Sequence, residues 1–480
     1  MQGAAIALAA ARGLHVAGVL SAFGTLLASV IGLGGSRKAL GRLLIGSVLL
    51  ALAAAPFWLV LQAGEMAGAT NLAGAWAAAP VALFGTGFGH AMQLRLGALV
   101  VAGVLGLRGR LSRAVALFAA AVACIAQVRM GHAAAAETTW QAPAAAAHML
   151  AAGAWVGGLL PLVTALDVAA IRAARRFSLL GVLAVSVIVV TALVQAAALV
   201  GGLPGLLGTA YGQVVLLKAL LFGVLLCFAG YNRLVLTPAL VGGDPAGAAR
   251  RMRRSVAMEA AVGLVTVLVA AWLSALAPGA HEQPVWPLPW QPTFQAFDDP
   301  DAASRLYVSF ALIAASLALA ATVAVWPRLR ARDRLAGLAA AAVVLGVALP
   351  RLSLLAMPAY PTSFFESPLA FTSRTVAAGA ALYPVHCAAC HGADGRGDGP
   401  LAAGLRMRPL PLTGFHLLER SDGEMFWLLS HGVPDGRGGL AMPGFAQHLS
   451  EDERWDLIAY IQTLAGATPD DKAAPAHHHH

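Results

Sequence analysis

Apolar residues occur in long, nearly continuous stretches as far as about residue 355, with short polar segments between them. A bilayer core about 30 Å thick requires about 20 apolar residues in a spanning α-helix. The first stretch is too long for a signal peptide and has no basic segment before it, so we expect it to be a span. Ten stretches predict membrane-spanning helices, at about 4–34, 43–63, 80–107, 114–131, 143–166, 178–201, 211–236, 255–277, 304–327 and 335–355.

Beyond the last stretch the chain becomes polar and rich in glycine and proline, which predicts a separate small domain. The pattern as a whole predicts an all-α protein: a polytopic inner-membrane helix bundle of about ten spans, followed by a small α-helical domain. The expected parts are an eight-span domain (1–280), a connector (281–303), two further spans (304–355), a linker (356–369), a C-terminal domain (370–470) and the remnant of a tag (477–480).

Composition and charge agree with a membrane protein. The chain is 59% hydrophobic and 11% charged, whereas soluble domains contain about 25% charged residues. The net charge is +9, but from Glu366 onward 8 Lys and Arg stand against 13 Asp and Glu, so this part carries −5 and the rest carries +14. The basic excess therefore belongs to the loops between spans, where lipid is the expected partner, and it does not indicate nucleic-acid binding.

The basic residues are confined to alternate loops. The loops at about 64–79, 132–142, 202–210 and 278–303 contain no Lys or Arg, whereas the loops between them are rich in arginine. By the positive-inside rule, the arginine-rich loops are cytoplasmic. With ten spans, both termini and the C-terminal domain are then expected on the periplasmic side of a bacterial inner membrane.

The C-terminal domain contains the sequence Cys387-Ala-Ala-Cys390-His391. C-x-x-C-H is the attachment motif of c-type haem. Two thiols at this spacing reach two vinyl groups of one macrocycle, and the adjacent imidazole reaches the iron. The motif predicts one covalently bound haem c. Its attachment takes place on the periplasmic side, in agreement with the expected orientation.

Two further features follow the motif: a glycine-rich segment after His391, and Met442 directly before a proline. With them, residues from about 370 to 466 resemble a class I mono-haem cytochrome c. The resemblance implies a mainly helical fold with His391 and Met442 as axial ligands. A thioether ligand raises the reduction potential relative to two histidines, so we expect an electron carrier. The competing sixth ligands are Met407, Met425, His416, His431 and His448.

Four histidines lie near the periplasmic ends of predicted spans. Ionisable residues inside spans are rare and are usually functional. Four imidazoles at a similar depth predict one site that faces the periplasm, although each of them alone is also explained as a packing residue. Imidazole suits copper, zinc and haem iron alike. The four residues are His15, His90, His132 and His148.

Other side chains in the spans support this site. Arg95 lies about one turn deeper than His90, where it is expected to face a haem propionate, a quinone or an acidic partner, and Lys218 lies in the outer half of its span. Soft sulfur ligands favour Cu(I), with core packing as the competing interpretation. The thioethers nearby are those of Met92, Met130 and Met149.

The eight-span part contains several short motifs. They are Gly131-His132-Ala133, His148 with Trp155-Val156-Gly157-Gly158, Tyr211-Gly212 with Lys218, Asn232-Arg233, and Arg254-Ser255 with Glu259. With these motifs, residues about 1–280 resemble the copper resistance protein D family (CopD, PcoD). The resemblance implies copper uptake or handling at the inner membrane. Within the motifs, Glu259 and Arg233 lie near the cytoplasmic ends of their spans, which predicts an ion pair between them.

Two functions fit these features, and both use the same residues. In the first, the histidines bind copper near the periplasm and the haem c exchanges an electron with it. In the second, pairs of histidines ligate haem b, and electrons pass from a quinol or another small donor through haem b to haem c. A mere membrane anchor for the cytochrome needs far fewer spans. Either function makes the chain a candidate membrane oxidoreductase, with a periplasmic electron-transfer or copper-carrier protein, or a quinone, as its partner.

Overall fold

The structure is a computed structural model, and the chain divides into two compact units, Met1–Glu282 and Gln283–His480. The residues that it describes are 2–130, 140–166, 170–242, 244–326 and 329–468. Among these residues, ten helices are long and apolar enough to cross a membrane. The predicted all-α fold with ten spans is therefore confirmed.

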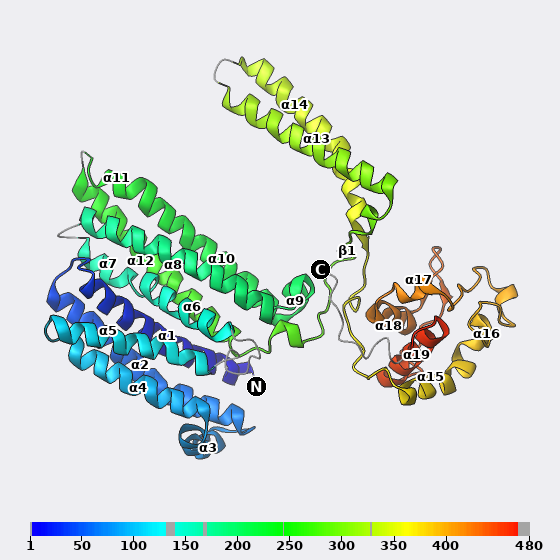
Figure 1. The fold of residues 1–480 in the computed structure, drawn as a ribbon, viewed down its shortest axis with the longest axis horizontal. Helices are drawn as coiled ribbons and strands as arrows, with labels where there is room; N and C mark the ends of the chain where they lie inside the picture. The colour runs from blue at the N-terminus through cyan, green and yellow to red at the C-terminus, as the bar shows by residue number, and fades with distance from the viewer. Residues whose placement is uncertain (1, 131–139, 167–169, 243, 327–328, 469–480) are drawn as a thin grey trace. The chain divides into compact units, whose positions relative to one another are not determined.

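The first unit is a bundle of long helices (Figure 1). These helices are α1 (Gln2–Val30), α2 (Arg37–Met66), α4 (Gly87–Gly106), α5 (Arg110–Ile125), α6 (Gln141–Trp155), α8 (Ala170–Leu199), α10 (Ala210–Tyr231) and α12 (Pro245–Leu273). Shorter helical segments lie at their ends or between them: α3 (Leu72–Gly85), η1 (Ala126–Met130), α7 (Leu159–Ala165), α9 (Gly202–Gly208), η3 (Asn232–Leu236), α11 (Thr237–Ala239) and η4 (Gly279–His281).

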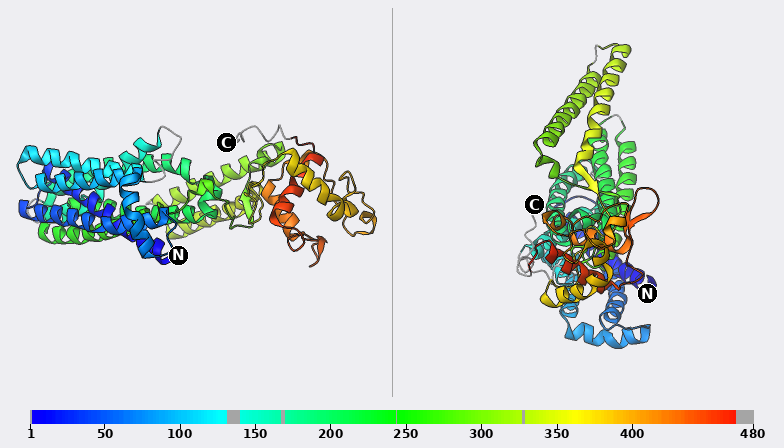
Figure 2. Two further views of the ribbon diagram at one scale, coloured as in Figure 1. Left: turned by 90° about the horizontal axis from the view of Figure 1, so that it is seen from below. Right: turned by 90° about the vertical axis from the view of Figure 1, so that its right-hand side faces the viewer.

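Helix α1 is the central element of this bundle, because it contacts α2, α5, α6 and α12. Figures 1 and 2 show these helices running side by side. Small residues permit close approach between membrane helices. A Cβ atom at Gly18 would lie 2.7 Å from the carbonyl oxygen of Ser47, and one at Gly24 would lie 2.2 Å from the carbonyl carbon of Gly157. A larger residue at either position would force α1 away from its neighbours.

The third span is shorter than the sequence predicts. The apolar stretch 80–107 is divided at Thr86, whose backbone is extended (φ −126°, ψ 154°). The Thr86 side chain accepts a hydrogen bond from the backbone N–H of Gly89, which caps the start of α4. The span therefore begins at Gly87, and the residues before Thr86 belong to the separate helix α3.

The second unit contains a helical hairpin whose two helices are the ninth and tenth spans. The segments that enter and leave this hairpin pair as short antiparallel strands, with Gln291 opposite Met357. This strand pairing holds together the segment before α13 and the segment after α14. The elements are β1 (Trp290–Pro292), η5 (Gln295–Phe297), α13 (Pro300–Val325), α14 (Ala331–Ala348), η6 (Leu349–Leu355) and β2 (Ala356–Pro358).

The C-terminal domain is mainly helical, as predicted. Its core includes the side chains of Tyr383, Cys387, Phe426 and Trp455. Its elements are α15 (Ser373–His386), α16 (Ala388–His391), η7 (Ala402–Gly404), α17 (Phe415–Leu418), α18 (Asp422–His431), β3 (Val433–Pro434), β4 (Leu440–Met442) and α19 (Glu451–Leu464). Strand β3 pairs with β4 in antiparallel fashion, and α15 packs against α19.

The connector and the linker both contact the start of α18. Thr362 Oγ1 in the linker donates a hydrogen bond to the carbonyl of Gly423 (2.6 Å). Gln291 Nε2 in the connector donates to Oε1 of Glu424 (3.1 Å). These contacts tie the C-terminal domain to the segments at the base of the α13–α14 hairpin.

Candidate functional site

One turn of helix brings the three residues of the C-x-x-C-H motif together. Cys387 follows the last residue of α15, and α16 carries Cys390 and His391. The backbone N–H of His391 donates to the carbonyl of Cys387 (2.9 Å). Cys387 is buried and Cys390 is half-buried, and burial together with the nearby Cys390 thiol raises the pKa of Cys387 to about 11. One thiol thus lies in the core of the domain and the other at its edge.

The imidazole of His391 is oriented by the backbone. Its Nδ1 lies 3.2 Å from the carbonyl oxygen of Leu410. A carbonyl only accepts hydrogen bonds, so Nδ1 carries the proton and Nε2 keeps its lone pair for a metal. Burial lowers the pKa of His391, against the opposing effect of the Leu410 hydrogen bond. A lowered pKa keeps the ring neutral, as an iron ligand must be.

Two methionines compete for the sixth position from within the core of this domain. Met442, at the end of β4, packs partly buried against the cluster that contains Cys387. Met425, on α18, is a buried member of the same cluster. The other candidates in the C-terminal domain are exposed at the surface: Met407, His416, His431 and His448.

The core of the domain also holds an unused hydrogen-bond donor. The Trp455 ring stacks on Phe426 with 4.2 Å between the ring centroids. Its Nε1 is buried and has no acceptor among the described residues. Such a donor suits a carboxylate of a bound group. Two thiols, an imidazole with a free Nε2, a thioether and this indole N–H together fit a covalently bound haem with propionate side chains.

In the first unit, charged and aromatic side chains gather around Trp58, which is fully buried. The guanidinium carbon of Arg12 lies 5.5 Å from the Trp58 ring centroid, and that of Arg95 lies 5.9 Å from it. The His15 ring lies 5.3 Å away between centroids. We call these four side chains the Trp58 cluster. It joins three long helices, because Arg12 and His15 belong to α1, Trp58 to α2 and Arg95 to α4.

His15 has one ring nitrogen engaged and one free. Its Nδ1 lies 2.7 Å from the carbonyl oxygen of Ala51, so Nδ1 is the protonated nitrogen. Its Nε2 is buried and has no hydrogen-bond partner among the described residues. Metal-ligating histidines usually donate their other ring N–H to a carbonyl or carboxylate in this way, so the arrangement is compatible with a metal ligand.

Arg95 is fully buried and has few partners for its positive charge. One terminal nitrogen donates to Gln127 Oε1 and lies 3.7 Å from the Met130 sulfur. Its Nε and its other terminal nitrogen have no partner in the described part of the chain. A buried charge without a counter-charge is costly, so this guanidinium indicates a place for an anionic group.

Arg12, Trp58 and Gln127 were not predicted as site residues. Arg12 donates to Ser274 Oγ (2.5 Å) and to Gln62 Oε1 (2.6 Å). The sequence did carry a signal for Arg12, because it lies inside the first apolar stretch and three residues before His15, on the same helical face. Gln127 carried a similar signal, because it is a polar residue inside the predicted span 114–131. Nothing in the local sequence marks Trp58, which reaches the cluster only through helix packing.

A pocket of about 340 Å³ lies beside the Trp58 cluster. Arg12 and Met130 line it and also contact members of the cluster. Met92 is almost fully buried, and both Met92 and Met130 pack in the apolar group around Trp58. The surroundings of His15 thus combine soft sulfur with two guanidinium groups. The other residues that line the pocket are Gln62, Glu65, Met66, Phe88, Arg129, Ser274 and Ala275.

His148 and His90 lie outside the Trp58 cluster. His148 Nδ1 lies 3.0 Å from Thr191 Oγ1 on α8, and Lys218 belongs to α10. His90 is exposed on α4. His132 lies outside the described residues, as do 477–480. Within the described ranges, no group of three or more His, Cys, Asp or Glu side chains is placed to hold a metal ion.

Comparison with known proteins matches three family models to separate parts of the chain. Residues 2–142 match the copper resistance protein D-like N-terminal domain, and residues 171–273 match copper resistance protein D. Residues 376–465 match cytochrome c. The Trp58 cluster lies in the first match, and the C-x-x-C-H motif lies in the third.

Three curated proteins are similar to parts of the chain. Copper resistance protein D of Pseudomonas syringae pv. tomato is 28% identical over 284 residues, which are 53% of this chain and 92% of that protein. Inner membrane protein YebZ of Escherichia coli (strain K12) is 34% identical over 140 residues, 28% of this chain and 48% of that protein. Cytochrome c-554(547) of Halothiobacillus neapolitanus is 36% identical over 90 residues, 18% of this chain and 94% of that protein.

Proposed function

Because the chain belongs to the copper resistance protein D family and ends in a cytochrome c domain, we propose that it is an inner-membrane redox protein that handles copper. In this proposal, copper binds in the membrane at His15. The electron that changes its oxidation state is exchanged with a haem c in the C-terminal domain. By the positive-inside rule, both the site and this domain face the periplasm.

The observation that carries the proposal is the free Nε2 of His15. It is buried, it keeps its lone pair because Nδ1 is bonded to the Ala51 carbonyl, and it has no partner among the described residues. The thioethers of Met92 and Met130 pack in the same apolar group. Imidazole and thioether together suit Cu(I). His148, whose Nδ1 lies 3.0 Å from Thr191 Oγ1, and Lys218 are not members of the Trp58 cluster, and we assign them a supporting role.

In the cytochrome c domain, Cys387 and Cys390 would attach the haem, and His391 and Met442 would be its axial ligands. A bound haem supplies reversible exchange of one electron. That single electron balances the change between Cu(II) and Cu(I). The apolar core around Cys387 also packs against Met442, and the Leu410 carbonyl fixes the orientation of the His391 ring. The expected partner is a periplasmic electron-transfer or copper-carrier protein.

One observation favours a second function. The Arg95 guanidinium is fully buried, has no carboxylate partner in the described part of the chain, and lies over the same indole ring as His15. An imidazole next to a guanidinium without a carboxylate partner also suits a haem b, with its iron on His15 and a propionate on Arg95. The protein would then oxidise a quinol or another small donor and have no role with copper.

Optical spectroscopy and metal analysis of the purified full-length protein distinguish the two functions. The reduced-minus-oxidised spectrum and the pyridine haemochrome report the haem types, and elemental analysis reports copper. Stoichiometric copper with haem c as the sole haem is the expected result. A b-type band without copper would replace the first function by the second. Haem c with neither copper nor haem b would contradict both.

A further inference from the structure

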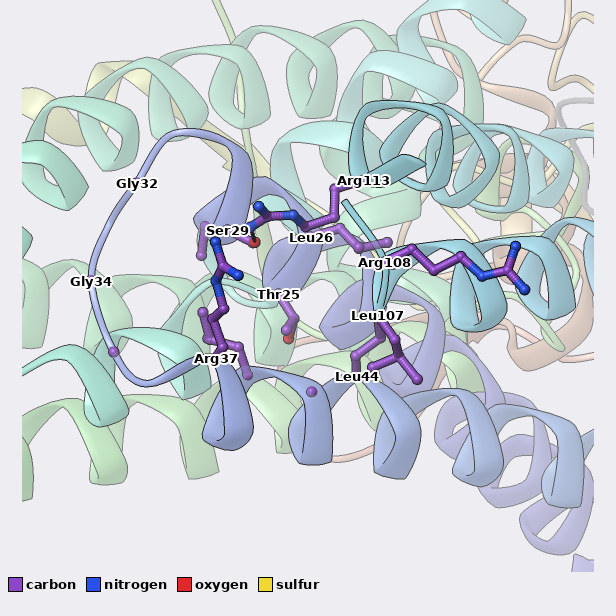
Figure 3. Close-up of a pocket in the computed structure, with 15 residues that line it drawn as sticks. Thr25, Leu26, Ser29, Gly32, Gly34, Arg37, Leu44, Leu107, Arg108 and Arg113 are labelled. Carbon is purple, nitrogen blue, oxygen red and sulfur yellow. Dashed lines mark hydrogen bonds between the residues drawn. The ribbon is translucent and has the colours of Figure 1, made fainter. Parts of the chain in front are cut away.

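A pocket of about 270 Å³ lies where α1 ends and α2 begins (Figure 3). The end of α4 and the first turn of α5 form its other side. It lies toward the opposite end of α1 from Arg12, because Thr25, which lines it, is 13 residues further along the helix, or about 20 Å. The pocket is therefore separate from the Trp58 cluster and plays no part in the function proposed above.

All charged side chains that line this pocket are cationic. Arg37 comes from α2, Arg108 from the turn after α4, and Arg113 from α5, and none of the 15 described residues that line the pocket is Asp or Glu. Figure 3 shows the guanidinium groups of Arg37 and Arg113 directed toward Ser29, whereas Arg108 extends away. Two positive charges that converge without an acid between them repel each other, so the arrangement favours a bound anion.

Two polar groups in the pocket lack a protein partner. Thr25 is 2% exposed, and its hydroxyl makes no hydrogen bond in the described structure. Arg113 donates from one terminal nitrogen to Ser29 Oγ (2.9 Å), but its Nε is buried and unpartnered among the described residues. A buried donor without an acceptor costs about 1–3 kcal/mol. A ligand rich in acceptor oxygens would satisfy both groups.

We propose that this pocket binds a phosphate group. Phosphate offers several acceptor oxygens and pairs with guanidinium groups through two parallel hydrogen bonds. Helices α2 and α5 both begin at the pocket, and their N-terminal ends add partial positive charge. Leu26 and Leu44 line the pocket beside the arginines, so it can also accept the start of an acyl chain. The phosphate is supplied either by a phospholipid headgroup at this membrane surface or by free phosphate.

Binding assays on the full-length protein in detergent test the proposal. Native mass spectrometry and thermal unfolding would be recorded with phosphatidylglycerol, with inorganic phosphate, and with a diacylglycerol that lacks the phosphate. Binding of phosphatidylglycerol alone identifies a lipid headgroup, and binding of inorganic phosphate as well identifies a general phosphate site. Failure of both phosphate sources to bind, or equal binding of the diacylglycerol, would overturn the proposal.

Arginine variants inside and outside the pocket test whether the phosphate binds in this pocket. Arg37→Gln and Arg113→Gln should each weaken binding about tenfold, as expected for loss of one charge-assisted hydrogen bond. Arg172→Gln and Arg175→Gln remove exposed arginines at the start of α8, which do not line the pocket, and should change affinity less than twofold. Arg37 is exposed, so its variant keeps the test valid even where Arg113→Gln impairs folding. Equal loss in the α8 variants and the pocket variants would indicate unspecific attraction and refute the site.

Discussion

Asn232 donates a 2.9 Å hydrogen bond from Nδ2 to Oε2 of Glu259, and both side chains are buried. The sequence predicts an ion pair between Glu259 and Arg233, and that prediction is wrong. Arg233 instead donates to Ser178 Oγ (2.9 Å). Asn232 and Arg233 begin the π-helical segment η3, where consecutive side chains project in different directions, so the two residues have different partners.

We predict that Asn232→Leu lowers the free energy of unfolding by about 1–3 kcal/mol, because Glu259 loses a donor inside the bundle. Glu259→Gln should cost less, since the amide oxygen still accepts from Asn232. Arg233→Gln is the matched control and should have a small effect, because Arg233 is exposed. Denaturant unfolding in detergent micelles measures all three. If Arg233→Gln lowered the free energy of unfolding more than Asn232→Leu, the ion pair between Arg233 and Glu259 would be the stabilising contact after all.

The number of spans and the helical C-terminal domain could be predicted because both rest on local sequence. Span length follows from the hydrocarbon thickness alone. The predicted span 80–107 was too long, and the cause is equally local. The Thr86 side chain caps the start of α4, so the apolar stretch forms two helices and not one. A small, uncharged residue such as Thr86 does not interrupt the apolar pattern, so the pattern alone does not reveal that a helix ends there.

The sequence indicates only some members of the candidate site in the membrane, for reasons of packing. His15 and Arg95 stand out as polar residues in apolar spans, and the structure brings them to the same indole ring. Trp58 is apolar and does not stand out, although it joins them. Depth along a helix can be read from a sequence, but the direction in which a side chain faces depends on the neighbouring helices. His90 illustrates this, because it was predicted at a similar depth to His15 and is exposed.

Replacement of His15 should therefore differ sharply from replacement of His90. We expect His15→Ala to abolish the copper or haem b of the membrane part, because it removes the free Nε2. His90→Ala should retain that cofactor in full. Metal analysis and the reduced-minus-oxidised spectrum provide the measurement, and the haem c band serves as an internal reference for protein amount. Equal loss in both variants would support a shared site of several histidines.

Met442 and Met425 allow a direct test of the sixth haem ligand. Met442→Ala should leave the haem attached through Cys387 and Cys390, change its spectrum and lower its reduction potential, because the thioether ligand is lost. Met425→Leu conserves volume in the same core cluster and should leave both properties unchanged. Redox titration followed by absorption measures them. The reverse outcome would assign the ligand to Met425.

Glu424 should give the C-terminal domain a specific dependence on pH. Burial raises its pKa, against the opposing effects of Arg420 and of the hydrogen bond from Gln291. A carboxyl with a higher pKa in the folded state binds more protons when folded. Its contribution to stability is therefore complete below the unfolded pKa of about 4.3 and is lost as the pH rises through the folded value.

Glu424→Gln removes this titration. With rising pH through that window, the wild-type domain should lose stability relative to Glu424→Gln, and below pH about 4 the difference should become constant. Thermal unfolding of the full-length protein, followed by haem absorption at a series of pH values, provides the comparison. Parallel pH profiles for the two proteins would show that Glu424 titrates alike in the folded and unfolded states.

Helices α15 and α19 approach each other closely at Gly379, which has no side chain. A Cβ atom at Gly379 would lie 2.1 Å from the backbone oxygen of Asp456, which cannot move without displacing α19. Gly379→Ala should therefore destabilise the C-terminal domain by about 1–3 kcal/mol through overpacking, although alanine is the better helix former. Gly404→Ala is the matched control, because nothing lies within 4 Å of a Cβ atom there and its backbone is not left-handed. Unfolding followed by haem absorption should show a lower midpoint for Gly379→Ala alone, and equal midpoints for the two variants would mean that the helices separate at little cost.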